Sequence, residues 1–168
     1  PLVLGAMMRS LELDERAAGA LMTAALLCMG LVALACAPLL TGARQRRVAV
    51  AATVVIILGE SAASLNTSAA WMMLWMLAIG LGAGALLAAI NAIIATSRRP
   101  EALFGYALMS AYAVAALLVL GLAPAIALAG HHGAFATLAA FSLTLLPLLR
   151  WLPGVADPAA PLTAVPDM

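Results

Sequence analysis

One acidic residue interrupts an otherwise uncharged apolar segment, and its side chain is the first candidate for chemistry. Glu60 comes about twelve residues after Val48, where the apolar run begins, which is roughly 18 Å along a helix. An ionisable group at such depth in a membrane is costly and typical of a functional site, and a carboxyl group suits proton coupling or cation recognition. The structural alternative places Glu60 near the outer interface, where water reaches it beside Ser61 and Ser64.

Other polar residues and a proline lie inside the apolar segments. Asn91 either hydrogen-bonds a neighbouring helix or touches a substrate in a cavity. Tyr106 and Ser110 are also substrate or coupling candidates, because they are four residues apart and share a helix face, although a tyrosine near a helix end more often anchors the interface. Pro124 removes one helical hydrogen bond, which in membranes often marks a kink or a moving segment.

Three glycines at alternate positions, Gly80, Gly82 and Gly84, lie in the middle of one apolar segment. Small residues let two helices approach closely, so this pattern predicts helix packing. A phosphate-binding loop is excluded, because no strand precedes the glycines and the segment is apolar throughout.

Residue types that could form a metal site or an enzyme active site are sparse. His131 and His132 are adjacent, with no carboxylate or third histidine in the same loop. Cys28 and Cys36 would lie about 12 Å apart along a helix, too far for a disulfide. Ser61 follows Gly-Glu as in an intramembrane serine-protease motif, but alanine replaces the expected glycine. We therefore predict no metal, no cofactor and no enzymatic activity.

Composition indicates the environment that must hold these residues. Hydrophobic residues make up 66% of the chain and charged residues 9%, whereas soluble domains have about 45–50% and about 25%. A bilayer is the expected partner, because apolar surface can face lipid there. The net charge of +1 gives no indication of nucleic-acid binding. Basic residues that are all arginine, together with much alanine, suggest a bacterial source.

Charged and turn residues divide the chain into helical segments. We predict an all-α, polytopic transmembrane helix bundle over residues 1–152, with a turn at 130–133 and a proline-rich linker or central loop at 153–168. Residues 1–8 make about 12 Å of helix, too short to cross, and are expected to be the tail of a truncated first helix. The predicted spans number about five: 16–42, 47–66, 69–96, 102–129 and 133–151.

Arginines gather in alternate loops. If the spans alternate in direction, six arginines share one side of the membrane and two share the other. The positive-inside rule places the arginine-rich side in the cytoplasm and predicts a multi-pass protein of the bacterial cytoplasmic membrane. The arginines assigned to the cytoplasmic loops are Arg44, Arg46, Arg47, Arg98 and Arg99, with Arg150 after the last span.

The order of these features resembles the N-terminal half of a major facilitator superfamily transporter. In the family's helix numbering, residues 1–6 resemble the end of helix 1, 11–19 the loop after it, and 38–47 the basic loop between helices 2 and 3. Residues 80–84 resemble the glycine motif of helix 4 and 100–106 the start of helix 5. Residues 133–135 and 149–153 resemble the two ends of helix 6. The basic loop lacks the family's aspartate, and Met76 stands where the family often has an arginine. Ala123 precedes Pro124 in place of the glycine of the antiporter motif.

The resemblance implies a fragment of a secondary active transporter that moves a small-molecule substrate by alternating access. Helix 4 lines the central cavity in that family, which makes Met76 and Asn91 substrate candidates, while a proton or cation could couple transport. The partner that completes the cavity would be the missing C-terminal half of the same chain. The alternative is a non-transport scaffold or assembly subunit that packs through small-residue helix faces.

Overall fold

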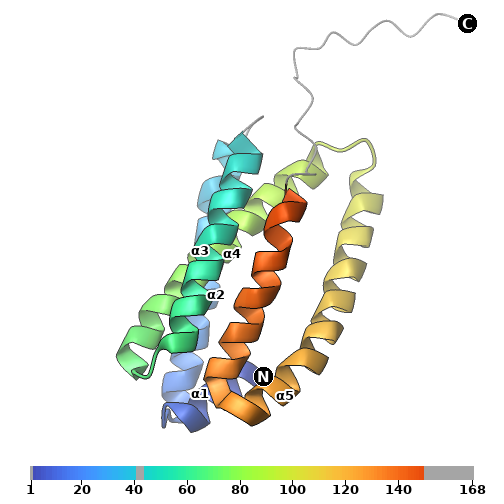
Figure 1. Ribbon diagram of the computed structural model, residues 1–168. Helices are drawn as coiled ribbons and strands as arrows, with labels where there is room; N and C mark the ends of the chain where they lie inside the picture. Colours follow the sequence, from blue (N-terminus) through green and yellow to red (C-terminus); the bar gives the residue numbers. More distant parts are fainter. Residues whose placement is uncertain (1, 41–43, 150–168) are drawn as a thin grey trace, which may run out of the picture.

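The structure, a computed structural model, describes residues 2–40 and 44–149, and this part of the chain is helical without strands (Figure 1). This confirms the predicted all-α class. The linker predicted at 153–168 and the residues Arg150 and Trp151 lie outside the described residues. The elements are α1 (Leu2–Ser10), α2 (Glu15–Cys36) with a short 3-10 turn (Ala37–Leu39), α3 (Arg44–Leu65), α4 (Ala69–Ala95) and α5 (Pro100–Leu148).

Local chemistry explains where several helices begin and end. Asp14 caps α2, because its carboxylate accepts a hydrogen bond from the Ala17 amide at 2.7 Å. At the other end of α2 the helix tightens into the 3-10 turn at Pro38, which has no amide hydrogen to donate. In the turn between α3 and α4, the Asn66 side chain donates to the Ser68 carbonyl at 2.7 Å and accepts from its amide at 3.2 Å.

Helix α5 covers most of the last two spans that the sequence predicts, 102–129 and 133–151. Its 49 residues comprise two helices joined at non-helical backbone, Ala129 and Gly130. A straight helix of that length would measure about 74 Å. Instead the chain reverses at the break, and the two halves run in opposite directions (Figure 1). Gly130 has φ 58° and ψ −137°, a conformation that favours glycine.

Within residues 2–40 and 44–149, four helices are long and apolar enough to cross a membrane: α2 with its 3-10 extension, α3, α4 and α5. The count differs from about five spans plus a tail, because the predicted segments 102–129 and 133–151 fall within one element. Helix α1 has nine residues, about 13 Å, and is too short to cross.

Helix α4 packs against both α2 and α3 through its glycines. A Cβ at Gly80 would lie 2.5 Å from the Ala25 carbonyl oxygen of α2, and one at Gly82 would lie 2.8 Å from the Ala52 carbonyl oxygen of α3. A Cβ at Gly84 would also collide with the Met29 carbonyl oxygen of α2. The three glycines therefore bring the backbone of α4 into contact with neighbours on two sides.

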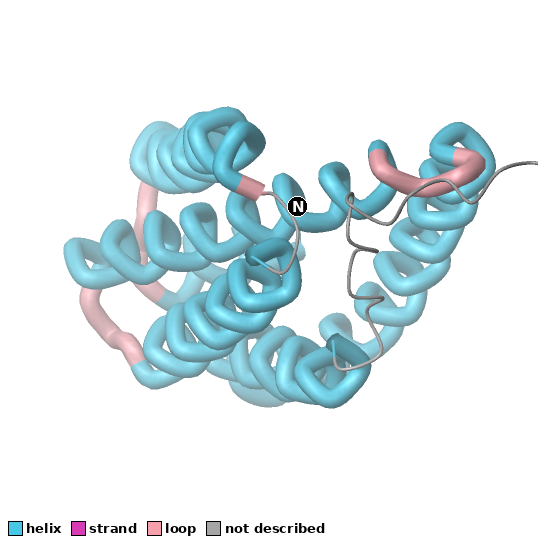
Figure 2. The backbone as a smooth tube through the Cα atoms, turned by 90° about the horizontal axis from the view of Figure 1, so that it is seen from above, coloured by secondary structure: helices cyan, strands magenta, loops and turns pink. Residues whose placement is uncertain are grey.

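The two halves of α5 have different surroundings. The half after the break packs against α3 through Phe135 and Leu138, near the end of α1. The half before the break stands apart from α2, α3 and α4 (Figures 1 and 2), and its apolar side chains are largely exposed. Leu120 is 72% exposed and Leu128 is 89% exposed. In a membrane this first half would face lipid or another helix.

Candidate functional site

A cavity of about 190 Å³ lies where the five α-helices converge near one end of the bundle. Among the described residues that line it, Glu60 of α3 is the only one with an ionisable side chain. The cavity lies about two helical turns inside the end of the bundle that carries the Gly130 break and the α3–α4 turn. Its walls are formed by Val3, Leu4 and Met7 of α1, Met22 of α2, Glu60 of α3, Met76 and Ile79 of α4, and Phe135 and Leu138 of α5.

The Glu60 carboxyl group is enclosed and incompletely paired. The residue is 6% exposed, so neighbouring side chains enclose it almost completely. The buried Ser142 hydroxyl of α5 lies beside it. Its Oε2 atom has no hydrogen-bond partner among the described residues. Burying a carboxylate without a partner is costly, so this group favours a proton or a positively charged ligand.

Two contacts fix the end of α3 that carries Glu60. A Cβ at Gly59 would lie 2.8 Å from Ile79 Cγ1, which shows how closely α3 and α4 approach beside the cavity. One turn further, the Ser64 hydroxyl donates to the His132 carbonyl oxygen at 3.0 Å, and His132 Nδ1 lies 2.5 Å from the Ser64 carbonyl oxygen. The last turn of α3 is thereby attached to the break in α5.

The histidine pair serves this attachment. His131 is 1% exposed, its Nε2 lies 2.9 Å from the Asn66 carbonyl oxygen, and its amide donates to the Ser10 hydroxyl at 3.4 Å. The two imidazole rings lie side by side with centroids 3.9 Å apart. Residues 2–40 and 44–149 contain no cluster of three histidine, cysteine or acidic side chains that could hold a metal ion. These histidines join the ends of α1, α3 and the second half of α5.

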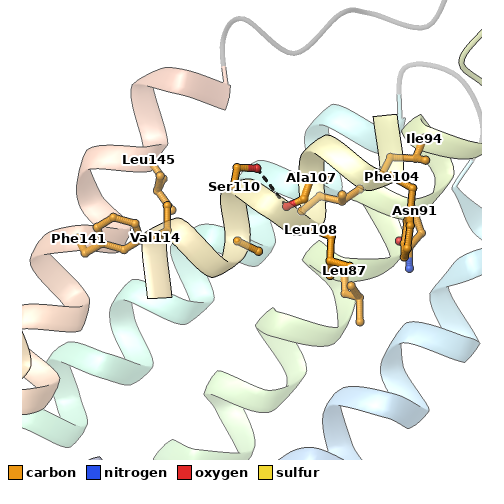
Figure 3. A pocket seen from close by; sticks show the side chains of 12 residues that line it. Leu87, Asn91, Ile94, Phe104, Ala107, Leu108, Ser110, Val114, Phe141 and Leu145 are labelled. Atoms are coloured by element: carbon orange, nitrogen blue, oxygen red, sulfur yellow. Dashed lines mark hydrogen bonds between the residues drawn. The ribbon is translucent and has the colours of Figure 1, made fainter. Parts of the chain in front are cut away.

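The sequence-predicted substrate candidates fall into separate places. Met76, which is 8% exposed, lines the same cavity as Glu60. Asn91 and Ser110 line a different groove of about 510 Å³, formed by the end of α4 and both halves of α5 (Figure 3). Tyr106 is 71% exposed and lines neither of these two spaces.

The groove at Asn91 is open and mostly apolar, with Phe104 and Phe141 on its sides (Figure 3). Ser110 uses its hydroxyl within its own helix, donating to the Tyr106 carbonyl at 2.8 Å and to the Ala107 carbonyl at 3.0 Å. Asn91 is exposed at the end of α4. The groove therefore offers one amide group against an apolar wall and no charged side chain.

Several residues around Glu60 escaped the sequence reasoning: Met7, Met22 and Phe135 in the cavity wall and Ser142 beside the carboxyl group are ordinary components of apolar helices in the sequence. No spacing links them, since they belong to three different helices. Pro124, the predicted kink, is exposed five residues before Ala129, where the backbone leaves the helical conformation. The signal that marks the break is Gly130, within the predicted turn.

The arginines predicted to lie in the cytoplasmic loops occupy one end of the bundle. Arg44, Arg46 and Arg47 begin α3 and are exposed, and Arg98 and Arg99 form the connection before α5. These two regions lie at the end opposite the Gly130 break (Figure 1).

Compared with models of protein families, with curated proteins and with solved structures, this chain matches none of them. The resemblance to the major facilitator superfamily therefore stays a prediction.

Proposed function

We propose that this chain is part of a secondary active transporter that moves a small solute across the bacterial cytoplasmic membrane by alternating access. The observation that supports this best is the Glu60 carboxyl group, buried beside a cavity that all five α-helices line. Buried ionisable groups inside membrane helices mark substrate or ion pathways, because their cost must be offset by a function.

The arrangement of the helices is compatible with five membrane crossings. We assign one crossing each to α2, α3, α4 and the two halves of α5. By the positive-inside rule, the arginine-rich end of the bundle would face the cytoplasm. It carries Arg44, Arg46, Arg47, Arg98 and Arg99. The cavity then lies nearer the opposite, outer side.

In the order of its features the chain resembles the N-terminal half of the major facilitator superfamily. In such transporters two halves move against each other around a site near the bilayer midplane. A second half would move against this bundle, so transport requires the complete gene product. Met76 and Glu60 would form this chain's contribution to the solute site.

The test is the accessibility of the cavity from each side of the membrane. The native cysteines, Cys28 and Cys36, are unpaired and are first replaced with alanine in the complete protein. Met76→Cys is then labelled with a membrane-impermeant maleimide in right-side-out and inside-out vesicles, with and without a pH gradient. We expect labelling from both sides, with the preferred side changed by the gradient.

The matched control is Met72→Cys, one turn earlier on α4 and 0% exposed in the core. It should resist labelling from either side. Labelling of Met76→Cys from a single side under both conditions, or from neither side, would contradict alternating access.

A scaffold or assembly subunit is the second candidate, and the exposed first half of α5 favours it. The faces with Gly80, Gly82 and Gly84 already contact α2 and α3 of the same chain. A partner helix would therefore use the first half of α5, where Gly105 has no neighbouring atom within 4 Å of an added Cβ. A stable hetero-complex that shows no alternating labelling of Met76→Cys would support this function.

A further inference from the structure

The Glu60 cavity combines one acidic group with apolar walls, and this combination defines a ligand class more closely than transport alone. We propose that the cavity binds a small lipophilic organic monocation, with an ammonium group on Glu60 and an apolar body of single-ring size between the methionines and Phe135. The inference rests on the proposed function, since it names the solute for the same site.

The charge of the ligand follows from the lining. Glu60 is the only ionisable side chain among the residues that form the cavity, and its Oε2 lacks a partner among the described residues. One ammonium group would neutralise one carboxylate and donate to that oxygen. A divalent cation would leave an uncompensated positive charge, and an anion would be repelled.

The size of the ligand follows from the volume. A dry, apolar cavity of about 150 Å³ in another protein holds benzene. The cavity here, at about 190 Å³, therefore has room for one aromatic ring with a short aminoalkyl group. A bare metal ion would fill little of this space.

The walls favour an organic cation over a hydrated inorganic one. Magnesium and calcium ions need a shell of about six oxygen ligands. Here the other side chains that line the cavity are thioethers, aliphatic groups and one phenyl ring, and the Ser142 hydroxyl beside Glu60 adds a single oxygen. Met7, Met22 and Met76 are polarisable and adapt to irregular shapes, and the Phe135 ring can attract a cation that comes within about 6 Å of its centre. Met22 is 39% exposed and lies at the edge of the cavity.

The test compares two molecules of nearly equal shape, benzylammonium and its neutral counterpart ethylbenzene, by calorimetric titration of the complete protein in detergent at neutral pH. We expect benzylammonium to bind more tightly. Glu60→Gln should weaken benzylammonium binding about 10- to 100-fold, the range for loss of a hydrogen bond to a charged group. Ethylbenzene affinity should stay within about twofold, because the apolar walls are intact.

Glu101→Gln is the matched control, since Glu101 is an exposed acid in the first turn of α5, next to the arginine-rich connection. It should leave the affinity for both molecules unchanged. Ethylbenzene binding by Glu60→Gln also shows that the variant is folded.

Three results would overturn the inference. The first is no binding of benzylammonium, and the second is the same benzylammonium affinity for the Glu60→Gln variant as for the unsubstituted protein. The third is binding of silver(I) alone, which would indicate a soft-metal site of thioethers. These outcomes are separate from the labelling test of transport. Alternating labelling of Met76→Cys without benzylammonium binding would indicate a transporter of another solute. Benzylammonium binding without alternating labelling would indicate a receptor or scaffold.

Discussion

The conformation of a single residue, Gly130, lets α5 reverse its direction. Its positive φ is one that side chains with a Cβ rarely adopt, and an added Cβ would lie 2.7 Å from the Ser10 hydroxyl oxygen. We expect Gly130→Ala to lower the free energy of unfolding by about 1–3 kcal/mol, the usual cost of strained backbone at one residue. Unfolding in mixed detergent and denaturant, followed by circular dichroism, measures the change.

Gly121→Ala serves as the comparison for Gly130→Ala. It lies in the helical part of α5, and its added Cβ would approach Thr137 Cγ2 only to 4.0 Å. Gly121→Ala should be neutral or stabilising by up to about 1 kcal/mol, because alanine is the better helix former. Equal effects of the two substitutions would show that the break does not depend on Gly130.

At the residue scale, the sequence singled out Glu60 and Met76 but not the other residues that line their cavity. Glu60 stands out because one charge within an apolar run is visible without any structure. Met7, Met22 and Phe135 meet Glu60 only because three other helices converge on it. Such convergence depends on helix rotation and tilt, which no spacing within one segment encodes. Asn91 and Met76, both on α4, line different spaces because about 22 Å of helix separates them along the axis.

At the element scale, the contact between α2 and α4 depends on glycines of α4. A Cβ at Gly84 would collide with the Met29 carbonyl oxygen, and this backbone atom cannot move aside as a side chain can. We expect Gly84→Ala to destabilise the protein by about 1–3 kcal/mol through overpacking. The same unfolding titration measures it.

Gly30→Ala is the control on the partner helix. Gly30 belongs to α2, and no atom lies within 4 Å of its added Cβ. The substitution should be neutral or mildly stabilising, since only helix propensity changes. Destabilisation by Gly30→Ala that matched the effect of Gly84→Ala would argue against glycine-mediated packing of α2 on α4.

The helices themselves were predictable where charges or capping residues mark their ends. Asp14 marks the start of α2, and Arg44 marks the start of α3. Residues 102–148 have no fixed charge to mark a helix end. The sequence predicts a turn at 130–133 there, but it does not predict how few residues of this turn leave the helical conformation. Within that turn only Gly130 has non-helical dihedral angles, and Ala129, just before it, is the other non-helical residue of α5.

At the scale of the whole molecule, the separation of the first half of α5 from the rest could not be predicted. Hydropathy shows that this segment is apolar, and an apolar segment can face lipid, its own bundle or a partner. The exposure of Met109, Tyr112 and Leu117, each between 68% and 71%, distinguishes it from α4, which is buried along two sides. Helix periodicity does not separate these cases, since α4 and α5 are apolar around their whole circumference.

The two ends of the molecule should lie on opposite sides of the membrane. Leu39 and Thr96, both exposed, lie beside the arginine-bearing connections, whereas the exposed Thr67 lies in the turn at the other end. In the protein without native cysteines, we expect Leu39→Cys and Thr96→Cys to react with an impermeant maleimide only from the cytoplasm. Thr67→Cys should react only from outside.

These substitutions keep every arginine, so the charge bias that orients the helices is unchanged. Reaction of Leu39→Cys and Thr96→Cys from opposite sides would mean that α3 and α4 do not form a pair of crossings, and the cavity around Glu60 could not then lie within the bilayer.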